Sequence, residues 1–68
     1  MTKEQFNMQR WHKNMMCRVM SRVGVVVGVD FQESTISIIF EDKQDEVHTY
    51  AYHYVTLMEQ NKNGLENN

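Results

Sequence analysis

The chain has 68 residues, of which 41% are hydrophobic and 24% are charged, with three glycines, no proline and a single cysteine. This length accommodates one small domain, because domains usually contain about 100 to 200 residues. A chain this short buries only about 60% of its unfolded surface, so its core is marginal and self-association is expected. The lone Cys17 cannot form an intramolecular disulfide, which favours a reducing compartment.

Neither a membrane span nor a secretion signal is predicted. The longest apolar stretch, residues 23–29, is far shorter than the ~18 to 20 residues of a membrane helix and contains Gly24 and Gly28. The first five residues lack the apolar core of a signal peptide. We therefore expect a soluble, cytoplasmic protein with no membrane partner.

The net charge of −2 is unevenly distributed along the chain. Residues 1–22 carry five basic side chains and one acidic side chain, a net +4, whereas residues 23–68 carry two basic and eight acidic side chains, a net −6. This asymmetry indicates an electrostatic partner for one of the two halves. The alternative is that the halves complement each other within a monomer or a dimer.

A short helix is predicted at the start of the chain, within a segment of residues 1–15. Thr2 and Gln5 have the spacing of a capping box, in which each side chain satisfies a free backbone donor of the first turn. The apolar periodicity continues this helix to about Asn14.

The large apolar side chains of the helix predict an interface between subunits. Met8, Trp11 and Met15 fall on one stripe, and Phe6 lies near the opposite side. Because a helix of about a dozen residues is marginal alone in water, it must dock on another surface. We expect a homodimer through an open sheet edge and four residues of this helix: Phe6, Met8, Trp11 and Met15.

Period-two alternation replaces the helical pattern from about Met16 and predicts β-structure. One parity is rich in valine and is expected to face the core: Cys17, Val19, Val23, Val25, Val27 and Val29. The run is longer than a typical strand of about 5 to 6 residues. We therefore expect a break near Ser21 and Arg22 or a sharp bend at Gly24, with a bend or bulge at Gly28.

The remainder of the chain alternates between strands and polar connections. A polar loop at residues 30–34 precedes a strand at 35–40, a charged turn at 41–46, a strand at 47–52, a break at 53–54, a short strand at 55–58 and a disordered tail at 60–68. Pairing across the charged turn predicts an antiparallel meander.

Three segments resemble an SH3-like small β-barrel of the KOW and Tudor type: RVGVVVGVD at residues 22–30, IIFED at 38–42 and YHYVTLM at 52–58. The resemblance implies a mainly β fold in which the short N-terminal helix precedes a five-stranded antiparallel barrel over residues 16–59. The aromatic-rich motif with which SH3 domains grip proline-rich peptides has no counterpart here. The size and composition are also consistent with an accessory protein of a phage or mobile element.

No catalytic or metal-binding pattern emerges from the sequence, so we predict neither an enzyme nor a cofactor. Cys17 lies on the valine-rich parity, where a thiol is a small core residue rather than a nucleophile. The three histidines, His12, His48 and His53, lack the spacing of metal ligands on strands.

The acidic loops predict binding to a basic protein surface. If the two loops open toward neighbouring edges of a barrel, their carboxylates form one surface: Asp30, Glu33, Glu41, Asp42, Asp45 and Glu46. Such a surface can occupy a nucleic-acid-binding site on a partner protein and inhibit it by charge mimicry. The alternative is a solvated turn.

The leading segment supports a second function, nucleic-acid binding. Basic residues interleaved with an aromatic residue bind phosphates and stack on bases. The residues in question surround Trp11: Arg10, Lys13, Arg18 and Arg22. The competing interpretation is that Trp11 anchors the helix, with the charges solvated around it.

Overall fold

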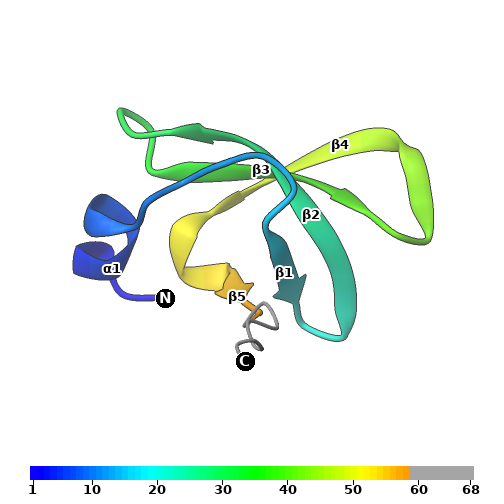
Figure 1. Ribbon diagram of the computed structural model, residues 1–68, viewed down its shortest axis with the longest axis horizontal. Coiled ribbons are helices and arrows are strands. Elements are labelled where there is room, and N and C mark those ends of the chain that lie inside the picture. The colour runs from blue at the N-terminus through cyan, green and yellow to red at the C-terminus, as the bar shows by residue number, and fades with distance from the viewer. Residues whose placement is uncertain (59–68) are drawn as a thin grey trace, which may run out of the picture.

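The computed structural model of the chain describes residues 1–58 and shows a mainly β fold with a short N-terminal helix (Figure 1). Five antiparallel strands form one sheet in the order β4-β3-β2-β1-β5, which is open between β4 and β5. The elements are α1 (Lys3–Met8), β1 (Met16–Val19), β2 (Arg22–Asp30), β3 (Thr35–Phe40), β4 (Lys43–Ala51), the 3-10 helix η1 (Tyr52–Tyr54) and β5 (Thr56–Leu57). The tail predicted for residues 60–68 lies outside the described residues.

The helix is shorter than predicted. Thr2 caps it, its Oγ1 accepting a hydrogen bond from the Gln5 amide at 3.1 Å, but the helix ends at Met8 rather than near Asn14. Two features stop it. The indole Nε1 of Trp11 donates to the carbonyl of Phe6 at 3.0 Å and satisfies one of the free carbonyls of the last turn. Beyond it, the Asn14 amide donates to the carbonyl of Val26 and so joins the sheet instead of a helix.

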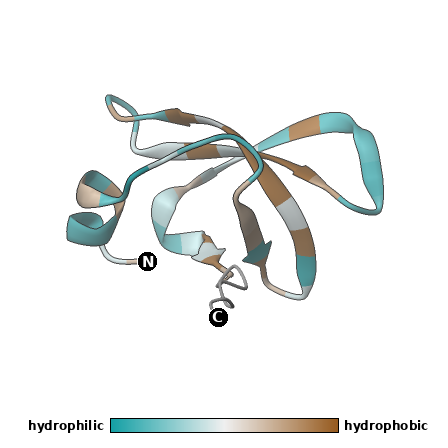
Figure 2. Cartoon of the chain, viewed as in Figure 1, coloured by the Kyte–Doolittle hydropathy of each residue, from teal (hydrophilic) through white to brown (hydrophobic). Residues whose placement is uncertain are grey.

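The core lies on one face of the sheet, under α1 and η1. Its buried members come from α1, the segment before β1, the strands β1 to β3 and the residue before β5, and none comes from β4: Phe6, Met15, Cys17, Val19, Val26, Ile36, Ile38, Phe40 and Val55. Phe6 is fully buried, with its ring centroid 5.3 Å from that of Phe31, 5.5 Å from that of Tyr52 and 5.8 Å from that of Trp11. The apolar residues of the sheet concentrate on β2 and β3 (Figure 2).

The face of β2 that meets the core is the opposite of the predicted one. A two-residue turn joins β1 to β2, so buried Cys17 pairs with Gly24. Residues directly opposed across two strands share a face. Odd-numbered residues of β1 therefore share the core face with even-numbered residues of β2, and Val26 is 2% exposed. The prediction that Val23 and Val25 face the core is wrong: both lie on the other face, which we call the outer face.

A β-bulge divides β2 at the predicted glycine. The register against β3 shifts between Val26 and Gly28, and Val27 has no partner in it. Val27 is half-buried and is not a core residue, contrary to prediction. The bulge also reverses the parity of the strand, so Val29 pairs with buried Ile36 and packs against the core as predicted.

The charged segment after β3 is largely strand rather than turn. Phe40 pairs with Lys43 across a two-residue turn, and the register then shifts before Ile38 pairs with His48. Residues 41–47 are all exposed. The β3–β4 hairpin consequently extends from the body of the molecule (Figure 1).

Candidate protein-binding surfaces

The β3–β4 hairpin carries four of the six acidic residues predicted to bind a partner: Glu41, Asp42, Asp45 and Glu46. Glu46 Oε2 lies 3.8 Å from Lys43 Nζ, and its Oε1 lies 3.2 Å from His48 Nε2. The Lys43–Glu46 pair is exposed to solvent and contributes little to stability, so both side chains are free to exchange partners. We call residues 41–47 the acidic hairpin.

Asp42 is already paired within the chain. Its Oδ1 accepts a hydrogen bond from Arg22 Nη2 at 3.0 Å, and this bond lowers the pKa of the Asp42 carboxyl. The same guanidinium lies 3.9 Å from the ring centroid of Phe40. Arg22, predicted to contact nucleic acid, and Asp42, predicted to contact a protein, therefore neutralise each other, as expected if the two halves of the chain complement each other.

The six acidic residues do not form one surface. Asp30 and Glu33 lie at the β2–β3 turn, whereas the acidic hairpin lies at the other end of β3 (Figure 1). Successive turns of an antiparallel meander alternate between opposite ends of the sheet, so the two loops are separated by the length of the strand. Asp30 also has a local role, because its Oδ1 accepts hydrogen bonds at 3.0 Å from the amides of Gln32 and Glu33.

Two of the four residues predicted to form a subunit interface on the helix are buried within their own chain. Phe6 and Met15 are 0% and 8% exposed and belong to the core of their own chain. Trp11 is half-buried against that core, and of the four residues Met8 alone is strongly exposed, at 77%. A six-residue helix places one large side chain inward, and here that residue is Phe6.

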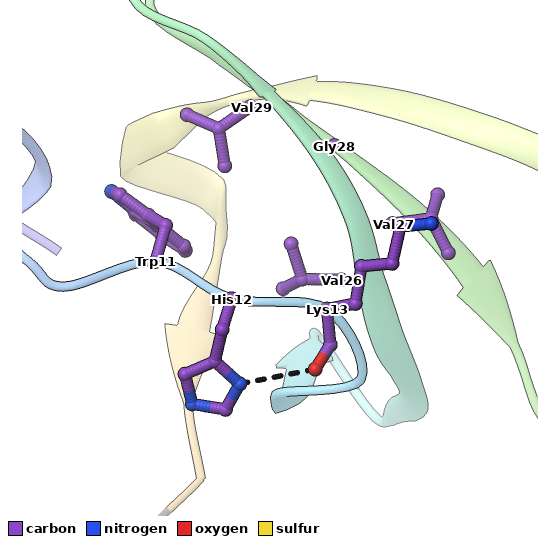
Figure 3. Close-up of a pocket in the computed structure, with 7 residues that line it drawn as sticks. All are labelled: Trp11, His12, Lys13, Val26, Val27, Gly28 and Val29. Atoms are coloured by element: carbon purple, nitrogen blue, oxygen red, sulfur yellow. Dashed lines mark hydrogen bonds between the residues drawn. The ribbon is translucent and has the colours of Figure 1, made fainter.

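A small groove lies where the segment after α1 crosses the bulge of β2. Trp11, His12 and Lys13 form one side, and Val26, Val27, Gly28 and Val29 form the other (Figure 3). Its volume, about 170 Å³, is below the ~300 to 1,000 Å³ of sites for whole small-molecule ligands, so it accepts a single ring or side chain. Arg10 and Lys13 are exposed on this segment, whereas Arg18 lies on the outer face of β1.

Cys17 is buried, and burial raises the pKa of its thiol to about 11 from 9.0. A reactive cysteine needs the reverse, a lowered pKa with access to solvent. Among residues 1–58, no three His, Cys, Asp or Glu side chains gather closely enough to hold a metal ion.

We expect the Cys17 thiol to stabilise the fold fully below pH 9 and to lose this contribution progressively as the pH rises from 9 towards 11. The folded state holds this proton more tightly than the unfolded state, so the stabilisation is complete below the unfolded pKa and is lost as pH rises through about 11. A shift of this size corresponds to roughly 2 to 3 kcal/mol. Urea unfolding at pH 8 and pH 10.5 measures it. Cys17→Ala is the control that removes this slope; equal slopes in both proteins would contradict the assignment.

The sequence does not predict a hollow of about 300 Å³ that lies between the acidic hairpin and the outer face. Val25, Ile39, Phe40, Glu41 and Gln44 line it. The alternation of valines in β2 is the signal for it, because before the bulge the valine parity that includes Val25 lies on the outer face rather than in the core.

Comparisons with known proteins found no relative: no family, curated protein or solved structure matches the chain. In the part of the chain that the structure describes, no helix has both the length and the apolar character needed to cross a bilayer.

Proposed function

We propose that the chain is a non-enzymatic protein-binding module whose acidic hairpin contacts a basic surface on a partner protein. One observation carries the proposal: residues 41–47 are consecutively exposed on an extended hairpin that holds four carboxylates and one lysine. The fold makes little use of this charge: within residues 1–58 the Asp45 side chain forms no hydrogen bond or ion pair, and Glu46 contacts only Lys43 and His48 of the same strand. With Asp42 paired to Arg22, the binding residues are Asp45 and Glu46.

We further propose that the architecture is an SH3-like barrel. The meander of β1 to β4 and the 3-10 turn before a short fifth strand beside β1 are the arrangement that the resemblance implies. In this architecture the sheet positions exposed hairpins rigidly, and binding depends on the side chains that the hairpins carry.

Binding by the acidic hairpin works through complementary charge. Carboxylates on a rigid hairpin attract a lysine- or arginine-rich surface and orient it during the encounter. A surface that normally binds nucleic acid suits this role, since the carboxylates take the place of phosphates. The partner is then inhibited for as long as the hairpin occupies its site, and binding weakens as ionic strength rises.

The test compares two variants that remove the same charge at opposite ends of the molecule. Asp45→Asn with Glu46→Gln alters the acidic hairpin, and Glu4→Gln with Glu33→Gln is the matched control. Immobilised on beads and mixed with nuclease-treated lysate at low salt, the wild type and the control should retain the same basic proteins. The hairpin variant should lose them, and heparin should displace them from the wild type. Equal retention by both variants would contradict the proposal.

The groove beside Trp11 favours a second candidate, binding of single-stranded nucleic acid. It combines an aromatic ring with the cation of Lys13, and the indole is held in place by its bond to the Phe6 carbonyl. A base stacked on the ring with its phosphate near Lys13 is the arrangement used by single-strand binders.

Trp11 is the one tryptophan in the sequence, so its fluorescence reports on this groove directly. On the second proposal, a thymidine oligonucleotide at low salt quenches the emission, and Lys13→Gln weakens the effect several-fold. The acidic-hairpin variant serves as the control and should leave the quenching unchanged. Emission that does not respond to the oligonucleotide would eliminate this candidate.

A further inference from the structure

The outer face of the sheet carries an apolar row that the fold does not use. Met16 of β1 pairs with Val25 of β2, and Val25 pairs with Ile39 of β3, so the three side chains lie side by side across three strands. All three are half-buried on the face opposite the core. The elements outside the sheet pack instead on the core face, through Phe6, Trp11 and Tyr52 among others.

The composition of β2 supports a covered outer face. A sheet with one solvated face has strands in which apolar and polar residues alternate, whereas strands covered on both faces are apolar almost throughout. Between Arg22 and Asp30, β2 contains only valine and glycine (Figure 2). The apolar area is confined to one end of the outer face, because the next row holds Ser37 and Thr49, whose hydroxyls are hydrogen-bonded at 3.0 Å.

Charges flank this apolar area in a self-complementary pattern. In the row next to it, Arg18 of β1 pairs with Val23 of β2, and the Glu41 amide donates to the Val23 carbonyl at 2.9 Å. A cation and an anion thus lie on opposite sides of Val23, one strand away in each direction. Arg18 and Glu41 are both exposed, and Glu41 lines the same hollow as Val25 and Ile39.

We propose that a second copy of this chain packs on the outer face, with a two-fold axis running along β2. Rotation about that axis brings Arg18 of each copy over Glu41 of the other. It also places Met16 over Ile39 and Val25 over Val25, so the hollow beside the acidic hairpin receives apolar side chains. A closed dimer requires a patch that complements itself in this way.

The arrangement is physically reasonable for two packed sheets. Face-to-face sheets lie about 10 Å apart with their strands nearly aligned, as an axis along β2 requires. A small domain with a marginal core gains most from such an additional apolar contact. This inference does not depend on the proposed function, since Asp45 and Glu46 stay outside the contact.

Exchanging the charges of Arg18 and Glu41 tests the dimer. In sedimentation velocity at micromolar concentrations, the wild type should sediment as a dimer. Arg18→Glu alone and Glu41→Arg alone should each weaken the dimer by about tenfold or more, because like charges then face each other. The double variant should restore it. Failure of the double variant to restore dimerisation, or a monomeric wild type, would overturn the proposal.

A second pair of variants separates loss of the interface from loss of the fold. Val25→Lys places a charge on the axis and should give a monomer, whereas Thr49→Lys, on the polar part of the same face, should remain a dimer. Circular dichroism and urea midpoints establish that each variant is folded. Equal dissociation by both lysine variants would place the contact elsewhere. The Asp45→Asn, Glu46→Gln variant should remain dimeric, so failure of this inference is distinguishable from failure of the proposed function.

Discussion

Replacing Gly24 with alanine should destabilise the protein by about 3 kcal/mol or more. A Cβ atom at this position would lie 2.6 Å from the Ile39 carbonyl oxygen and 2.8 Å from Ile38 Cγ2. The first of these atoms is backbone, so relief requires β2 and β3 to move apart. Overpacking usually costs about 1 to 3 kcal/mol, and a clash with a neighbouring strand belongs at the upper end.

Gly28→Ala is the matched control for Gly24→Ala. Its Cβ would meet nothing closer than Ser37 Cβ at 3.8 Å, and no glycine in residues 1–58 has a positive φ. Alanine there should leave stability unchanged or raise it by about 0.4 to 1 kcal/mol, because it restricts the unfolded chain. Urea unfolding of the two variants measures the difference. Similar midpoints would contradict the close approach of β2 and β3 at Gly24.

Phe6→Ala should cost about 3 to 5 kcal/mol, the usual loss when a buried phenylalanine is truncated. The ring is fully buried between Trp11, Phe31 and Tyr52, so its removal leaves a cavity and detaches the helix from the sheet. For a chain of this length the total stability is about 3 to 10 kcal/mol. Much of the folded population should therefore be lost.

Met8→Ala removes a large apolar side chain from the same helix and is the control. Because Met8 is 77% exposed, its truncation should change stability by less than about 0.5 kcal/mol. Thermal unfolding followed by circular dichroism distinguishes the two variants. Equal losses would mean that the helix packs through a different face.

Periodicity predicted most of the fold. The β3 alternation, the turn before β2, the bulge at Gly28, the break before the last strand and the short last strand are all confirmed. These features depend on neighbouring residues, and local sequence encodes them. The end of the helix was missed because it depends on Trp11 reaching back to the Phe6 carbonyl and on Asn14 pairing with Val26, contacts that no local pattern reveals.

The face of β2 was missed for a related reason. Valines occupy both parities near the bulge, so composition alone does not say which parity is buried. The two-residue turn decides it, since a turn longer or shorter by one residue would put Val25 in the core instead of Val26.

The acidic surface was only partly predictable. Sequence identified the charged residues of the hairpin but placed Asp30 and Glu33 beside them, although a meander puts successive turns at opposite ends of the sheet. The ion pair between Arg22 and Asp42 is also not predictable from the sequence, because the two residues meet only after β2 and β3 have paired.

Amide chemical-shift mapping of the ¹⁵N-labelled protein tests the central claim most directly. The titrant is a basic protein retained by the wild type but lost by the Asp45→Asn, Glu46→Gln variant. We expect the largest chemical-shift changes at the amides of Asp45, Glu46 and Val47, and these changes should become smaller as salt is added. The amide signals of Trp11 and Lys13 should not shift. Shifts centred on Trp11, Lys13 and Gly28, with an unchanged acidic hairpin, would contradict the account.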